Sequence, residues 1–134
     1  MSLTAYLVPV NAASTDNNVL VVGANIGNVP WEFQDTAGAL IGFEIDLVNE
    51  VADRLNKEIN VINIPFNGLF SAVQSSRIDI AISSITITEQ RLTSVSFVQP
   101  YYDSDQSLTI RSDSKIESIK DLQGEIVAVD TGST

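Results

Sequence analysis

The chain has 134 residues, of which 44% are hydrophobic and 18% charged. This is the size and composition of a globular domain. Its formal net charge is −10, from 17 acidic and 7 basic residues, which speaks against a nucleic-acid partner because an acidic surface repels phosphates. The chain contains no cysteine and no histidine, which excludes disulfides, thiolate nucleophiles, Cys/His zinc sites and a Ser-His-Asp triad.

The first eighteen residues differ from the remainder. Residues 3–13 form an apolar stretch that ends in small residues, and a polar run follows over 14–18. This order is typical of a secretory signal remnant around a cleavage site. No Lys or Arg precedes the stretch, and Pro9 and Asn11 interrupt it, which favours a simple tail. The two interpretations of residues 1–18, tail or signal remnant, both stay open.

From residue 19 onward, strand patterns alternate with helix patterns. In chain order they predict a strand over 19–24, two extended pieces around a turn at 35–38, a helix over 45–55, a strand over 59–65, a helix over 68–76, a strand over 78–83, a helix over 88–95, a strand over 107–111, a helix over 116–122 and a strand over 125–130. Such alternation is typical of an α/β fold with a largely parallel sheet.

The helix over 45–55 shows the clearest apolar face. Ile45, Val48, Ala52 and Leu55 follow one another at spacings of three and four residues, so they lie on one side of a helix. Asp46 falls in the first turn, where a carboxylate interacts favourably with the helix dipole. We therefore expect Asp46 to have a structural role.

The stretch over residues 79–91 carries the most chemical information. A buried strand is followed by the hydroxyl residues Ser83, Ser84 and Thr86, and the next helix, for which Thr88 is a plausible N-cap, contains Arg91 in its first turn. Ligands of open α/β sheets bind at the carboxyl ends of strands. A guanidinium grips a carboxylate through two parallel hydrogen bonds. The pattern predicts a socket for a carboxylate.

Structural roles are the alternative for each of these residues. Arg91 could be a surface arginine paired with Glu89 or Asp53, and the hydroxyls could satisfy amides at the strand end. Phe66 could be ordinary core, as most aromatic residues are. Asn25, at the end of the first strand, could serve the site or the fold.

Five motifs in the same order resemble those of the extracytoplasmic solute-binding proteins of polar amino-acid ABC transporters. They are GFEIDL at 42–47, FNGLF at 66–70 with Ile78-Asp79, TITEQR at 86–91, FVQPYY at 97–102 and GEIVAVDTGST at 124–134. Each motif alone is weak, but five in register are specific. The resemblance covers about residues 19–134.

The resemblance implies an α/β fold of the type II periplasmic-binding-protein clamshell, mostly lobe one plus the beginning of lobe two. Residues 19–103 would form a partial lobe one that lacks its C-terminal return. Residues 104–134 would hold the hinge crossing, centred on 101–105, and a truncated start of lobe two. On this interpretation the chain is the N-terminal half of a family member.

The resemblance also implies a site for a free amino acid. Arg91 would grip the α-carboxylate with help from the Thr86 amide, and Ser84 and Thr86 would meet the α-ammonium and carboxylate groups. Phe66 would lie against the ligand side chain. The complete set of expected ligand-binding residues is Arg91, Thr86, Ser84, Phe66, Asn25, Ser83, Ser133 and Thr134, the last two approaching from the second lobe. No catalytic or metal-binding residue is expected.

Two positions depart from the family pattern. Many cation-binding members carry an acid where this chain has Asn25, and an aromatic lid where it has Asn28. Their absence favours a neutral polar amino acid over Lys, Arg or His.

The implied function is non-enzymatic and needs no cofactor. The protein would bind a polar amino acid between two lobes and deliver it to a membrane ABC permease, in the periplasm or outside the cell. An exposed sheet edge of such a half could pair with a second copy. Two alternatives share this fold: a ligand-sensing receptor domain, and a dehydratase. The dehydratase needs a cleft acid or base with a shifted pKa, and the sequence places none there obviously.

Overall fold

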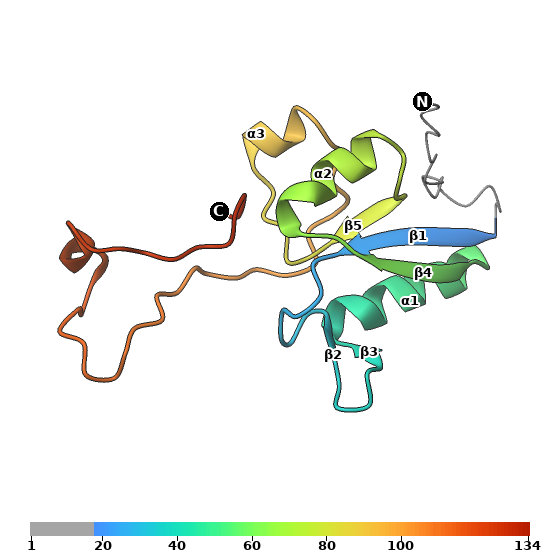
Figure 1. Ribbon diagram of the computed structural model, residues 1–134. Helices are drawn as coiled ribbons and strands as arrows, with labels where there is room; N and C mark the ends of the chain where they lie inside the picture. Colours follow the sequence, from blue (N-terminus) through green and yellow to red (C-terminus); the bar gives the residue numbers. More distant parts are fainter. Residues whose placement is uncertain (1–17) are drawn as a thin grey trace, which may run out of the picture.

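A three-stranded parallel sheet lies at the centre of the computed structural model, which describes residues 18–134 (Figure 1). Its strand order is β4–β1–β5, with β1 (Val19–Ala24) in the middle, β4 (Glu58–Asn63) on one side and β5 (Ile80–Ile82) on the other. Val19 is opposite Glu58, and Val22 is opposite Ile80. The expected α/β class with a parallel sheet is confirmed. The expected tail or signal remnant falls on residues 1–17, outside the described residues.

Helices cover both faces of this sheet: α1 (Phe43–Leu55) on one and α2 (Phe66–Gln74) on the other (Figure 1). Successive side chains of a strand point to opposite faces, so β1 contributes to two separate clusters. The cluster against α1 contains Leu20, Val22, Ala24, Ile45, Val48 and Ile82. The cluster against α2 contains Val21, Ile64, Phe66, Leu69, Ala72 and Ile78.

Helix α1 buries Ile45, Val48 and Ala52, as its periodicity predicts. The fourth member of the predicted face, Leu55, is 54% exposed, so its predicted burial is wrong. It is the last helical residue, and Asn56 then takes a left-handed conformation with φ 51° that redirects the chain into β4. At its other end α1 begins earlier than predicted and buries Glu44 completely.

The predicted turn at 35–38 joins β2 (Phe33–Gln34) to β3 (Leu40–Ile41) as an antiparallel hairpin. Asp35 Oδ1 accepts hydrogen bonds from the backbone N–H groups of Ala37 and Ala39, at 2.8 and 2.9 Å. Gly42 then leads into α1 with φ 131°, and a Cβ there would lie 2.3 Å from the carbonyl oxygen of Trp31. This close approach requires glycine.

Helix α3 (Glu89–Leu92) is shorter than the predicted 88–95. Thr88 is its N-cap, as expected, and its hydroxyl accepts from the Arg91 N–H at 3.2 Å. The helix stops because two hydroxyl residues follow it: Thr93 Oγ1 donates to the Gln90 carbonyl and Ser94 Oγ donates to the Arg91 carbonyl. Such local bonds compete with a continuing helix.

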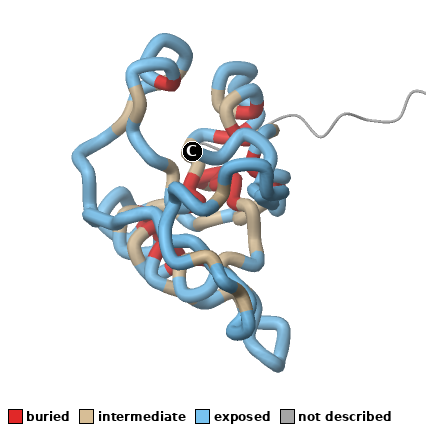
Figure 2. The backbone as a smooth tube through the Cα atoms, turned by 90° about the vertical axis from the view of Figure 1, so that its left-hand side faces the viewer, coloured by how far each residue is buried: buried red, intermediate tan, exposed pale blue. Residues whose placement is uncertain are grey.

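Beyond α3 the chain leaves the sheet, and its last residues return toward α2 and α3 (Figure 1). None of the described residues from 101 to 134 is buried (Figure 2). The predicted strands over 107–111 and 125–130 do not form, and Ile126 is 99% exposed. An apolar pattern describes which side chains a strand would bury, but a strand also needs a neighbour for its backbone N–H and C=O groups. No described segment supplies one here.

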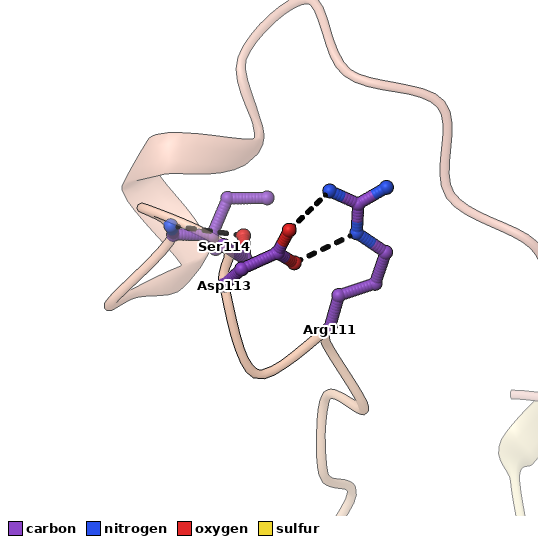
Figure 3. A network of polar contacts seen from close by, with 4 residues as sticks. Arg111, Asp113 and Ser114 are labelled. Atoms are coloured by element: carbon purple, nitrogen blue, oxygen red, sulfur yellow. Dashed lines mark hydrogen bonds and ion pairs between the residues drawn. The ribbon is translucent and has the colours of Figure 1, made fainter.

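Local polar contacts shape this segment instead. The Arg111 guanidinium donates two hydrogen bonds to the Asp113 carboxylate, at 2.8 and 2.9 Å, and Ser114 Oγ accepts from the Ile116 N–H (Figure 3). The predicted helix over 116–122 is a 3₁₀ turn, η1 (Ile119–Leu122), closed by a reciprocal capping box. Across residues 18–134, no helix combines the length and apolarity needed to cross a bilayer.

Candidate ligand-binding cleft

The carboxyl ends of β1 and β5 open onto a cleft of about 500 Å³. Because the strands are parallel, these ends lie at the same edge of the sheet. Asn25 follows β1 and Ser83 follows β5 directly. The cleft is lined by Asn25, Ile26, Gly27, Asn28, Glu32, Phe66, Ser83, Gln106, Asp130 and Ser133.

Hydrogen bonds join the two strand ends. Ser83 Oγ accepts from the Asn25 backbone N–H at 2.8 Å and donates to Glu32 Oε1 at 2.8 Å. Ser84 Oγ accepts from Asn28 Nδ2 at 3.1 Å. The two serines are therefore held by groups from the chain segment that follows β1.

Arg91 on α3 is only 9% exposed. Its guanidinium donates to the carbonyl oxygens of Thr86 and Gly132, both at 2.8 Å. The guanidinium carbon lies 5.4 Å from the ring centre of Phe66 and 5.1 Å from that of Phe70, within range of a cation–π contact. Burial lowers the pKa of Arg91, although an arginine keeps its charge at neutral pH.

The chain end closes over the same region. Thr134 Oγ1 lies 2.9 Å from Thr86 Oγ1, and Asp130 Oδ2 accepts from Asn25 Nδ2 at 3.2 Å. Residues far apart in the sequence thus meet at the strand ends.

The structure brings all the predicted site residues into one neighbourhood. Asn25, Phe66, Ser83 and Ser133 line the cleft, Ser84 contacts the lining residue Asn28, and Thr86, Arg91 and Thr134 form the adjoining polar network. The alternative pairing of Arg91 is wrong. In the described part of the chain the arginine ion pairs join Arg54 to Glu50 and Arg111 to Asp113.

Sequence reasoning missed two buried acids, Glu32 and Glu44, which are both 0% exposed. Glu44 Oε1 accepts from the Ser84 N–H at 2.8 Å and also from the Tyr101 hydroxyl. One signal was available for Glu44, which precedes Val48 by four residues and so shares its helix face. Glu32 lies in irregular structure between Trp31 and Phe33, where no periodicity marks it.

Burial and Glu44 together raise the pKa values of two neighbouring groups, Glu32 and Tyr101. Burial, followed by the hydrogen bond to Glu44, raises the pKa of Glu32 to about 8. Burial, with the hydrogen bond to Glu44 next in importance, raises the pKa of Tyr101 well above its usual range. This upward shift favours the protonated form of Glu32 at neutral pH. Within residues 18–134, no group of three or more Asp or Glu side chains is placed to hold a metal ion.

Comparison with known proteins defines the family. The sequence model of the bacterial extracellular solute-binding proteins, family 3, matches residues 20–133. The chain belongs to this family.

Two curated solute-binding proteins illustrate the relationship. The arginine-binding extracellular protein ArtP of Bacillus subtilis (strain 168) is 30% identical over 132 residues, which are 98% of this chain and 51% of the relative. The histidine-binding periplasmic protein of Escherichia coli (strain K12) is 31% identical over 114 residues, which are 84% of this chain and 44% of the relative. The chain thus spans about half the length of these relatives.

Solved structures of solute-binding proteins share the fold. The arginine-bound form of truncated ArgBP from T. maritima matches with a TM-score of 0.72 and 38% identity over 75% of this chain and 48% of that one. The arginine-bound form of domain 1 of TmArgBP matches with a TM-score of 0.63 and 40% identity over 64% of this chain and 68% of that one. The expected type II clamshell class is confirmed, with the described sheet and helices forming part of a lobe. The division after residue 103 stays a prediction.

Proposed function

We propose that this chain binds the α-carboxylate of a free polar amino acid at Arg91, as part of a receptor that closes on its ligand and delivers it to an ABC importer. The observation that carries the proposal is a nearly buried guanidinium that no acidic side chain of residues 18–134 neutralises. A buried charge needs a partner of opposite charge. An α-carboxylate is such a partner, and it matches the planar fork of arginine.

Neighbouring groups fit the rest of an amino acid. Two of the five guanidinium N–H groups of Arg91 donate to carbonyl oxygens, so further donors remain for a ligand. The Asp130 carboxylate lines the cleft and is exposed, and it supplies the negative charge that an α-ammonium group requires. Phe66 lines the cleft, and its ring centre lies 5.4 Å from the Arg91 guanidinium carbon, so a ligand side chain would lie against it.

Asn25 and Asn28 determine which class of ligand side chain the cleft accepts. Both line the cleft with amide groups, which donate and accept hydrogen bonds but carry no charge. We therefore propose a neutral polar ligand as the preferred one. The named relatives bind arginine or histidine, so cationic amino acids are the direct competitors to test.

Location and partners follow from the family. The named relatives are extracellular or periplasmic proteins, and we propose the same location and a membrane permease as the partner of the whole protein. Binding by hinge closure shifts a pre-existing equilibrium through contacts made only in the closed state.

Catalysis would need an accessible acid with a shifted pKa in the cleft wall. The described residues of the wall contain none. Glu32 corrects the expectation that no such acid borders the cleft, because it lines the cleft and its pKa is about 8. However, Glu32 exposes none of its surface, and its carboxyl group faces Ser83 and Glu44. It has no path to a ligand atom, so we propose binding without catalysis.

A thermal-shift panel of the twenty common L-amino acids tests the proposed function. At 100 times its Kd, a ligand adds about 2.7 kcal/mol to the free energy of unfolding. For a domain of this size that raises the melting temperature by ~4 °C or more. We expect this shift with polar amino acids and none with acetate or methylamine, which carry the same charged groups separately. A panel without any shift would contradict the proposal.

A further inference from the structure

The buried acids Glu32 and Glu44 stand between the cleft and the predicted hinge crossing. Each has one side-chain oxygen, Oε2, that is fully buried and has no partner. Both side chains are 0% exposed, and their mutual interaction is among the causes that raise the pKa of Glu32. Two carboxylates cannot bond without a proton, and buried unpartnered oxygens are costly. A single proton on the pair supplies the donor that two carboxylates lack.

The other oxygen of each acid bonds to one of two consecutive serines. Glu32 Oε1 accepts from the Ser83 hydroxyl, and Glu44 Oε1 accepts from the Ser84 backbone N–H, both at 2.8 Å. Ser84 has a left-handed backbone with φ 48°, a conformation that costs a non-glycine residue free energy and persists only when its surroundings hold it. The hydrogen bond from the Ser84 N–H to Glu44 Oε1 supplies this support.

Glu44 Oε1 has a second donor, the hydroxyl of Tyr101. Tyr101 lies at the start of the predicted crossing over 101–105. One oxygen atom thus joins the turn that carries Ser84 to the segment that must move when two lobes close. The titratable groups that face Glu32 are Glu44 on α1 and Tyr101 on this segment, with Asn28 and Ser83 as neutral partners.

We propose that Glu32 and Glu44 share one proton and act as positioning residues for ligand binding. In this state the pair holds Ser83 and Ser84 at the cleft and links them to Tyr101. The proposal rests on the proposed function, because the serines matter for affinity only if the cleft binds an amino acid. Loss of the proton places two negative charges side by side in the interior and releases the turn.

The test measures the affinity of the full chain for L-arginine and for L-glutamine by calorimetry at pH 6 and pH 9. If the cleft binds the amino acid only while the pair is protonated, the apparent Kd rises about tenfold one pH unit above the pKa of the pair. The reason is that the fraction of protein able to bind falls by the same factor. Glu32→Gln keeps a donor toward Glu44 and an acceptor for Ser83 but does not titrate, so its apparent Kd, whatever its value at pH 6, should not rise between pH 6 and pH 9. The titration of the ligand's own ammonium group affects both proteins equally and cancels in the comparison.

A second pair of variants tests the link to Tyr101. Tyr101→Phe removes the hydroxyl and should weaken binding about two- to tenfold, the value of one hydrogen bond. Tyr102→Phe is the matched control, because the Tyr102 ring packs on Trp31, a contact that phenylalanine preserves. Equal affinities of the two variants would overturn the link.

A readout without ligand separates this proposal from the proposed function. The hydrogen-exchange protection factor of the Ser84 amide, measured by NMR, should fall between pH 6 and pH 9 in the unmodified chain and stay constant in Glu32→Gln. If neither amino acid binds at any pH, the proposed function fails for them, and the Ser84 protection still decides the role of the pair. A protection factor with the same pH dependence in both proteins would overturn the shared proton.

Discussion

Replacing Arg91 with alanine is expected to weaken the binding of the preferred amino acid by roughly two to three orders of magnitude. Truncating one partner of a buried, hydrogen-bonded charge pair costs about 2–5 kcal/mol, and each 1.4 kcal/mol is a factor of ten in Kd. Arg91 is nearly buried against Phe66 and Phe70, so water screens its charge little. Calorimetric titration of both proteins with the same amino acid measures the loss.

Two further variants make this prediction specific. Arg54→Ala removes an exposed arginine that pairs with Glu50 on the surface of α1, and it should leave the affinity unchanged because exposed ion pairs contribute little. Arg91→Lys keeps the charge but loses the planar fork, so its affinity should be intermediate. Circular dichroism first establishes that Arg91→Ala is folded. If the folded variant binds the amino acid as tightly as Arg54→Ala does, the proposed role of Arg91 in binding is wrong.

The free energy of unfolding is expected to fall as the pH rises from about 5 to about 8. Glu32 has a pKa near 8 when folded, compared with 4.5 for an ordinary glutamate. Between these values the folded state holds a proton that the unfolded state has lost, so stability decreases with pH by up to ~1.4 kcal/mol per pH unit. The contribution is fully present below about 4.5 and is lost by about 8. Urea denaturation, followed by fluorescence of the single tryptophan, measures it.

Glu32→Gln isolates this effect from other titrations. The amide does not titrate, so the difference in stability between the two proteins should grow with pH in favour of the variant. Hydrogen bonds from the backbone of Glu117 and from Ser118 lower the pKa of Asp121. Asp121 therefore affects the free energy of unfolding at a lower pH than the range from about 5 to about 8. Glu50→Gln, an exposed position on α1, should follow the pH profile of the unmodified chain. Parallel profiles for Glu32→Gln and the unmodified chain would contradict the assignment.

The sequence predicts the elements in which side-chain pattern and packing agree. The spacing of Ile45, Val48 and Ala52 reflects burial against one face of the sheet, so α1 could be predicted closely. The hydroxyl run and Arg91 could be placed together because parallel strands end at one edge.

The remaining features depend on contacts that a pattern does not contain. Glu44 occupies an inward position of α1, but an acid there is recognisable only once Ser84 and Tyr101 are seen to donate to it. The segment over 125–130 has the continuous apolar run of a buried strand, yet a strand requires a pairing partner that the described residues do not provide. Short-range pattern therefore predicts which residues are apolar or polar, and the long-range pairing decides what they form.

A carboxylate site at Arg91 distinguishes an amino acid from the amine that lacks its α-carboxylate. Calorimetric titrations of the unmodified chain with L-arginine and agmatine, and with L-glutamine and 4-aminobutanamide, keep the side-chain groups and remove only the group that Arg91 is proposed to bind. The account predicts that, for the amino acid that binds more tightly, the amine binds about 100-fold more weakly or not at all. Equal affinity for an amino acid and its amine would contradict a carboxylate site at Arg91.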